Sequence, residues 1–147
     1  MKKGKGITEN RVNMGAFDFD IIIIVGDYKT TLAYVSWKFE DKKTNLADSD
    51  MGDIPRGKCF FRRGYVPVVW IPRKPQNSRE YATYAHECLH AVFHLFEWAN
   101  LPLTRDTEEV MTHAMAHLIT NGLKSNSSTV SIIFCNSLVN KLGGGIK

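Results

Sequence analysis

The chain has 147 residues, of which 44% are hydrophobic and 23% are charged, and its formal net charge is +4. This length suits a single domain, and this composition excludes both wholesale disorder and collagen-like structure. The three cysteines include no C-x-x-C pair, so a zinc ribbon and a thioredoxin-type site are excluded as well.

The first 40 residues predict a loose tail, a buried strand and a helix. Residues 1–15 are polar and aperiodic, which is typical of a flexible N-terminal tail. The β-branched run from Ile21 to Val25 predicts a fully buried strand. Asp27 can then cap a helix, and the apolar residues that follow share one face of it at helical spacing: Tyr28, Leu32, Val35 and Phe39.

The chain carries no pattern typical of secretion or membrane insertion. Its basic start leads into polar residues instead of the apolar core of a signal peptide. The run from Ile21 to Val25 is far shorter than the roughly 20 apolar residues that span a bilayer. We therefore expect a cytoplasmic protein with no membrane partner.

The middle of the chain predicts a long loop and then a β-hairpin. Residues 41–57 are polar and rich in Asp, Gly, Asn and Pro, as loops are. Two apolar runs follow, Lys58 to Arg63 and Tyr65 to Ile71, and they predict the two strands of the hairpin. Because proline cannot donate to a sheet ladder, Pro67 indicates that the second run is an edge strand or contains a bulge.

Basic residues gather around this hairpin without forming a dense stripe. They are Arg56, Lys58, Arg62, Arg63, Arg73 and Lys74. We interpret them mainly as solvated charges at loops and strand ends, so a nucleic-acid partner is not expected.

Two helices are predicted in the second half of the chain. Asn77 and Glu80 resemble a capping box, which favours a helix from Ser78 to about Asn100. A third helix is expected from Thr104 or Asp106 to about Gly122. We predict a single domain over residues 16–124 and a C-terminal extension over 125–147, whose apolar part can pack as a short helix or strand.

The predicted helix from Ser78 carries the sequence His86-Glu87-Cys88-Leu89-His90, which fits H-E-x-x-H. Residues four apart lie above one another on one helix face, so the two imidazoles can bind one zinc ion at about 2.0–2.1 Å. Glu87 is then within reach of a metal-bound water and can act as the general base. The pattern predicts a zinc-dependent hydrolase.

A third zinc ligand is expected on the next helix. The metzincin pattern requires a histidine six residues after His90, where this chain has Phe96. The gluzincin arrangement takes a glutamate from a following helix, and 18 residues separate His90 from Glu109. Glu109 is the first candidate. Glu108 is the alternative, and because the two point roughly 100° apart, only one of them can face the metal.

The remaining histidines have less defined roles. His94 is about 12 Å along the helix from His86, too far to share its metal, so we interpret it as a packing residue or as one that supports the metal ligands from behind. His113 follows Glu109 by one turn and can either stabilise an oxyanion or orient the glutamate. His117 is interpreted either as a core residue or as a residue that supports the metal ligands from behind, and Cys88 is expected to face the core.

The order of these motifs resembles a known family. His86 to His90 followed by Ala91, then Leu101-Pro102, then Thr107-Glu108-Glu109, is similar to the minimal gluzincin-type zinc peptidase domains. The chain is most similar to small phage-encoded proteins that carry this compact core, which would place it in a host cytoplasm. The resemblance covers roughly residues 65–124.

The resemblance implies a fold, a ligand set and a substrate class. The fold is α+β, with a small mixed sheet packed on an active-site helix and a glutamate-bearing helix. It implies zinc bound by His86, His90 and Glu109, Glu87 as general base, and a peptide or protein substrate. The family often has tyrosine where this chain has His113. The strand from Val66 to Ile71 would pair with an extended peptide.

Two other functions are compatible with the sequence. In the first, zinc only joins the two helices of a non-catalytic binding protein, and a fourth protein ligand such as His113 would close its coordination shell. In the second, an accessory protein of phage origin binds its partner through the hairpin and its basic residues Arg62, Arg63, Arg73 and Lys74.

Overall fold

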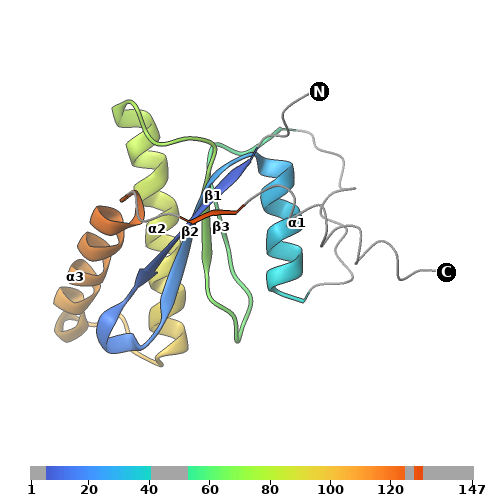
Figure 1. Cartoon of the computed structure of the whole chain (residues 1–147). Coiled ribbons are helices and arrows are strands. Elements are labelled where there is room, and N and C mark those ends of the chain that lie inside the picture. Colours follow the sequence, from blue (N-terminus) through green and yellow to red (C-terminus); the bar gives the residue numbers. More distant parts are fainter. Residues whose placement is uncertain (1–5, 41–52, 125–127, 131–147) are drawn as a thin grey trace, which may run out of the picture.

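A mixed five-stranded sheet forms the centre of the fold in the computed structural model, which describes residues 6–40, 53–124 and 128–130. Its strand order is β3-β4-β2-β1-β5, with β2 and β4 parallel and the other neighbours antiparallel (Figure 1). The α+β class predicted from the sequence is confirmed. The strands and helices are β1 (Ile7–Asn13), β2 (Asp20–Gly26), α1 (Tyr28–Lys38), β3 (Lys58–Phe60), β4 (Val68–Ile71), α2 (Ser78–Trp98), α3 (Arg105–Gly122) and β5 (Ser128–Val130), with a 3-10 turn at Gly15–Phe17.

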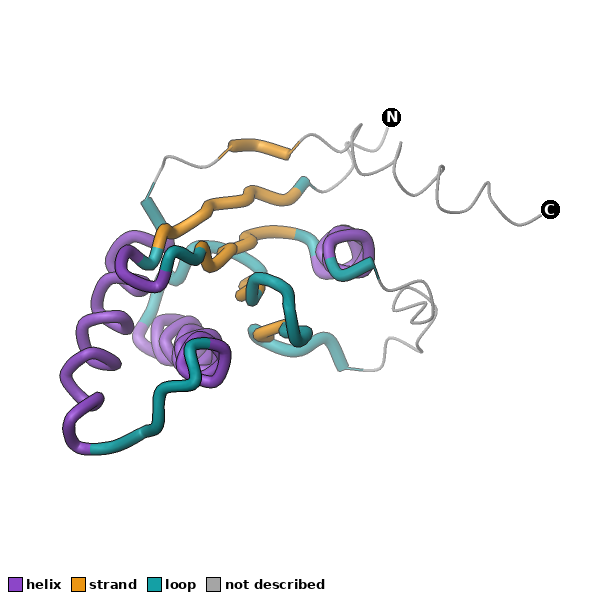
Figure 2. Tube along the Cα trace, turned by 90° about the horizontal axis from the view of Figure 1, so that it is seen from below, coloured by secondary structure: helices purple, strands orange, loops and turns teal. Residues whose placement is uncertain are grey.

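The helices cover the two faces of the sheet in separate layers. Figure 2 shows α1 on one side of the strands and α2 with α3 on the other. Successive residues of β2 alternate between these layers: Ile22 and Ile24 pack toward α1, and Ile21 and Ile23 pack toward α2 and α3. Burial on both faces explains why β2 is a continuous apolar run.

Two of the predicted helix starts are confirmed by their capping contacts. The Asp27 carboxylate accepts a hydrogen bond from the Thr30 backbone N–H at 3.0 Å, and α1 begins at Tyr28. The Asn77 side chain accepts one from the Glu80 N–H at 3.0 Å, and α2 begins at Ser78. A side-chain oxygen at the N-cap satisfies a donor that the helix itself leaves free, so these short motifs determine where each helix starts.

The contact between α2 and α3 is apolar and close. Tyr84 is fully buried, and its hydroxyl donates to backbone carbonyls of α3 at Leu118 and Ile119, 3.4 and 3.5 Å away. A methyl group added at Gly122 would lie 2.1 Å from the Tyr84 hydroxyl oxygen. The second half of α3 therefore packs closely on α2, because Gly122 leaves room for the Tyr84 ring and the Tyr84 hydroxyl donates to the α3 backbone.

The N-terminal tail predicted over residues 1–15 is wrong for residues 7–13, which form β1 inside the sheet. Its polar residues have specific partners instead of solvent. The Asn10 amide donates to carbonyls of Asn121 and Gly122 at 3.0 and 2.9 Å, and the Tyr34 hydroxyl donates to the buried Glu9 carboxylate at 2.9 Å. These partners lie more than 20 residues away, so local hydrophobic alternation does not reveal the strand.

The prediction that the second hairpin strand lies at an edge or contains a bulge is also wrong. The hairpin itself is confirmed, but β4 pairs with β3 on one side and with β2 on the other. Pro67 immediately precedes β4, and its carbonyl accepts the Ile22 N–H at 3.1 Å. Since that position only needs an acceptor, proline is tolerated there without weakening the ladder. The strand at the sheet edge is β3.

Several predictions fall partly or wholly outside the described residues. These are the tail at 1–5, the loop at 41–52 and most of the C-terminal extension, of which residues 128–130 form β5 beside β1. Among the described residues, no helix has both the length and the apolar character that a membrane span requires.

Candidate functional site

The first two predicted zinc ligands meet on the exposed face of α2. The Nε2 atoms of His86 and His90 are 3.1 Å apart, and the two rings stand nearly perpendicular with their centroids 4.7 Å apart. Two nitrogens bound to one tetrahedral zinc at 2.0–2.1 Å would be about 3.3 Å apart. The imidazole pair therefore has the spacing that a single divalent cation requires of two of its ligands.

Glu87 and His90 face a cavity of about 540 Å³ between α2 and the edge strand β3. Lys58 and Cys59 line it from the strand, and Glu87 itself is half-buried. A carboxylate beside an imidazole in a cavity with one open side is the arrangement that general-base chemistry needs. The other lining residues are Tyr28, Asp53, Pro55, Gly57, Phe61 and His94.

Gly57 brings the segment before β3 close to Glu87 and Thr83 of α2. A Cβ at this position would lie 3.1 Å from the Glu87 Cγ and 2.8 Å from the Thr83 Cγ2. The absence of a side chain at residue 57 therefore lets the segment before β3 run against α2. Sequence analysis missed this residue, because a glycine in a predicted loop gives no signal of the helix that it will contact.

His94 closes one end of the cavity by packing against the hairpin. Its ring stacks on Phe61 with the centroids 3.4 Å apart, and its Nδ1 lies 3.3 Å from a carboxylate oxygen of Glu97. Its partners are thus Phe61 and Glu97, and the packing role that the sequence indicated for His94 agrees with the ring contact. Phe61 was not among the residues singled out from the sequence, and an aromatic residue at the end of a short strand carries no functional signal by itself.

The third predicted ligand lies elsewhere in this structure. The Glu109 side chain is 86% exposed, and its carboxylate lies 3.7 Å from the Nε2 atom of His113. Glu108 is likewise exposed. Over residues 6–40, 53–124 and 128–130, no three His, Cys, Asp or Glu side chains converge into a group that could hold a metal. The histidine pair thus fits zinc, whereas a complete ligand set is not assembled here.

His113 and His117 also lie on the outer side of α3. The His113 side chain is 79% exposed beside Glu109, with no contact to Glu87. His117 is exposed instead of buried in the core, and its Nε2 is 2.8 Å from the Asn13 carbonyl. The core role predicted for His117 is therefore wrong: it forms a link between α3 and the end of β1.

The cysteines near the site are uncharged thiols. Burial raises the pKa of Cys59 to about 12, and the negative charge of Glu87 adds to this rise. Burial also raises the pKa of Cys88 to about 12, and Cys88 is fully buried, as the sequence predicted. A thiol must lose its proton to become a good nucleophile, so neither group is prepared for that role at neutral pH.

Comparisons of the chain with models of known protein families, with curated proteins and with solved structures found no match.

Proposed function

We propose that the protein is a zinc-dependent metallopeptidase with a zincin-like arrangement of helix and edge strand. His86, His90 and Glu109 would hold the metal, and Glu87 would act as the general base. The observation that carries this proposal is the His86–His90 pair with its 3.1 Å nitrogen spacing, next to a half-buried Glu87 that faces a cavity.

The edge strand supplies the substrate-binding side of this proposal. Since β3 is the end strand of the sheet, its outer backbone groups can pair with an extended peptide. A peptide added there would run past the cavity that Glu87 and His90 line. This role falls to Lys58–Phe60 instead of the internal strand β4, to which the family resemblance would assign it.

The proposed chemistry needs one proton carrier. Zinc bound at this site would polarise the scissile carbonyl and lower the pKa of an adjacent water molecule. The Glu87 carboxylate accepts a proton from that water as it attacks the carbonyl carbon, and then delivers the proton to the leaving amine. Its position in the cavity wall, partly shielded from bulk water, keeps it beside the peptide throughout.

The proposal requires the first turns of α3 to change orientation when zinc binds. The burial pattern allows this, because none of the residues from Arg105 to Val110 is buried, and the first buried side chain of α3 is Ala114. Turning this segment therefore exposes no fully buried side chain, and the half-buried Met111 is the residue packed on the core that would shift with it. Structural metals release enough free energy to drive local folding of this size. His113 would move together with Glu109.

Two observations favour this function over the alternatives. A zinc ion that only joins the helices needs no cavity beside it, whereas His90 and the proposed general base Glu87 line one of about 540 Å³. The hairpin surface is also partly occupied from within the chain: Arg62 donates to the Phe39 carbonyl, and Arg73 pairs with Glu80. Fewer free charges remain there for an accessory partner.

The substitution Glu87→Gln tests the proposal most directly. We expect hydrolysis of a mixed peptide library, followed by mass spectrometry, to fall by about 10²–10⁴-fold while zinc binding stays. Asp106→Asn, an exposed acidic residue on α3, is the matched control and should keep wild-type turnover. Equal turnover in wild type and Glu87→Gln would reject the mechanism.

A further inference from the structure

A second cavity, of about 350 Å³, is bordered by three arginines at the start of α2. Arg56 comes from the segment before β3, Arg73 from the turn after β4, and Arg79 from the first turns of α2. The three positions are separated in sequence by up to 23 residues and are brought together only by the fold. This cluster belongs to neither the histidine pair nor the cavity that Glu87 faces.

Among the residues that the structure describes, only one of these arginines has an acidic partner. Arg73 donates to a Glu80 carboxylate oxygen from Nε at 3.1 Å and from Nη2 at 2.5 Å, while the other Glu80 oxygen accepts the Gln76 N–H at 2.8 Å. The hydrogen bond from Arg73 and then that from Gln76 hold the pKa of Glu80 below its usual value. Glu80 therefore stays ionised and neutralises one of the three guanidinium groups.

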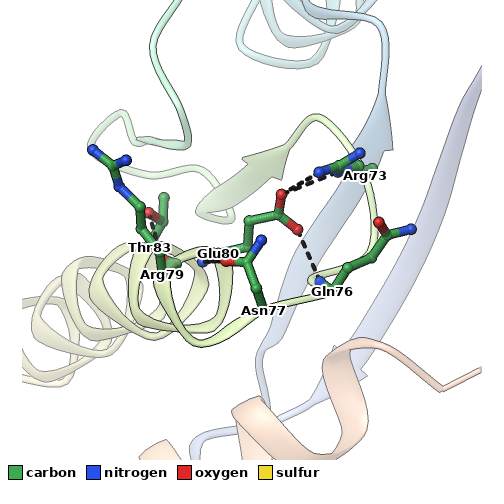
Figure 3. Close-up of polar contacts among 6 residues, drawn as sticks. All are labelled: Arg73, Gln76, Asn77, Arg79, Glu80 and Thr83. Atoms are coloured by element: carbon green, nitrogen blue, oxygen red, sulfur yellow. Dashed lines mark hydrogen bonds and ion pairs between the residues drawn. The ribbon is translucent and has the colours of Figure 1, made fainter.

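Arg56 and Arg79 keep their charge unpaired within the described part of the chain. Figure 3 shows the ion pair of Arg73 with Glu80 and, on the other side of Glu80, the Arg79 side chain extending from α2 without a side-chain partner among the residues drawn. Three guanidinium groups against one carboxylate leave a net positive cavity wall. Such a wall attracts an anion, and a carboxylate fits the fork of an arginine well.

The two cavities adjoin along α2. Arg56 lines the second cavity and the next residue, Gly57, lines the first. On the helix, Thr83 lines the second cavity and Glu87, one turn later, lines the first. A chain lying along this side of α2 therefore passes from one cavity to the other.

We propose that the second cavity binds an acidic side chain of a peptide substrate, an inference that rests on the proposed peptidase function. Arg79 is eight residues from Glu87, which corresponds to about 12 Å along the helix. An extended peptide advances about 3.3–3.6 Å per residue, so the acidic residue would lie about three or four positions from the bond that is cleaved. Arg56 and Arg79 bind its carboxylate, and the Arg73–Glu80 pair fixes the wall beside it.

Peptide binding tests this inference without requiring turnover. The host protein is Glu87→Gln, and the probes are fluorescently labelled 12-residue peptide pools that differ only in carrying Glu or Gln at every third position. We expect the Glu pool to bind about tenfold more tightly by fluorescence anisotropy, and the double substitution Arg56→Gln/Arg79→Gln to remove that preference. Arg63→Gln/Arg105→Gln, which removes the same charge from two exposed arginines outside the cavity, should keep it.

The outcomes separate this inference from the proposed function. Equal binding of the two pools, or a preference that both double variants lose alike, would overturn the acidic subsite even if the wild type cleaves peptides. If only the Arg56→Gln/Arg79→Gln variant loses the preference, the subsite is established. This holds even if the wild type shows no peptide hydrolysis, in which case the proposed peptidase function fails by itself. Circular dichroism of each variant shows whether the fold is retained, and the single substitution Arg79→Gln provides the second reading if the double variant fails to fold.

Discussion

Helices α2 and α3 both carry ionisable side chains at four-residue spacing, but the two sets lie in different surroundings. On α2, His86 and His90 meet beside Glu87 at the edge of the sheet. On α3, Glu109 and His113 meet each other, 3.7 Å apart, with both side chains largely in solvent. Four-residue spacing brings side chains of one helix together, but it does not determine which part of the protein, or whether solvent, lies opposite them.

The difference comes from how firmly each helix is packed. The buried side chains of α2 extend from Tyr84 to Phe96, on either side of the histidine pair, so its rotation is fixed where the motif lies. The buried side chains of α3 begin only at Ala114, after Glu109 and His113. The motif of α2 is therefore flanked by fully buried residues, whereas the motif of α3 is anchored only through the half-buried Met111 among the described residues between Arg105 and His113.

The largest expected effect comes from removing one imidazole of the α2 pair. In His90→Ala, we expect the zinc content of the purified protein to fall from about one per chain to near zero, because a single imidazole remains at the site. His94→Ala is the matched control, since His94 stacks on Phe61 outside the pair. Metal analysis by mass spectrometry measures both. A wild type free of zinc after dialysis against micromolar zinc would refute the metal centre altogether.

Removing the acidic group of α3 should have the next largest effect. We expect Glu109→Ala to bind zinc more weakly than wild type but more strongly than His90→Ala, because both imidazoles remain. Glu108→Ala should behave as wild type, since its side chain points roughly 100° away around the helix. Competition with a fluorescent zinc chelator gives the affinities. If Glu109→Ala retains the wild-type affinity, the solvent-facing position of Glu109 persists when metal is bound, and another donor completes the site.

Much of the fold can be predicted from local patterns. Asp27 and Asn77 cap α1 and α2 at the positions that the sequence indicates, and the run from Ile21 to Val25 forms the buried strand β2. Each of these signals depends on neighbours within four residues. Strand β1 could not be found in this way, because the partner that stabilises Glu9 is Tyr34 and the partners of Asn10 lie at the end of α3.

The candidate site likewise has one part that local sequence predicts and another that depends on contacts between distant segments. The histidine spacing follows from the geometry of one helix and is predictable, whereas the cavity depends on how the segment before β3 meets α2. Pro67 indicated that its strand lies at an edge or contains a bulge. Its carbonyl instead accepts a hydrogen bond from the Ile22 N–H, and β3 is the edge strand on this side of the sheet. Interactions between elements decided each feature that sequence analysis missed.

A methyl group at residue 57 tests the contact that positions Glu87. We expect Gly57→Ala to lower turnover by roughly tenfold to hundredfold, since displacing a catalytic group by about 1 Å costs up to that much. The new Cβ would lie 3.1 Å from the Glu87 Cγ and 2.8 Å from the Thr83 Cγ2. Overpacking of this kind also lowers the free energy of unfolding by about 1–3 kcal/mol.

A second substitution separates these two effects of Gly57→Ala. Thr83→Ala removes the closest clashing atom, so the double variant should regain stability in denaturant unfolding but not turnover. Full recovery of turnover in Gly57→Ala/Thr83→Ala would mean that crowding at Thr83, and not displacement of Glu87, caused the loss.

The smallest expected effect concerns how the first turns of the two helices are held. Glu80 of α2 accepts hydrogen bonds from Arg73 and from the Gln76 N–H, and these lower its pKa below the usual 4.5. A carboxyl group with a depressed pKa in the folded state stabilises the fold above its unfolded pKa, and this stabilisation is lost as the pH falls through the folded value. Glu80→Gln should therefore have a lower thermal unfolding midpoint than wild type at pH 7.

The pH dependence of that difference distinguishes the ion pair from a general effect of charge. The gap between Glu80→Gln and wild type should close as the pH falls below 4.5 and through the lowered pKa of Glu80, because the wild-type carboxyl group then becomes protonated and loses its charge. Glu108→Gln is the matched control: Glu108 also lies in a first helical turn and meets the same helix dipole, but it has no arginine partner among the described residues. The difference in thermal unfolding midpoint between Glu108→Gln and wild type at pH 7 should be smaller than that for Glu80→Gln. Equal gaps in the two variants would show that the dipole alone accounts for the stabilisation, and that the start of α2 is held no more firmly than the start of α3.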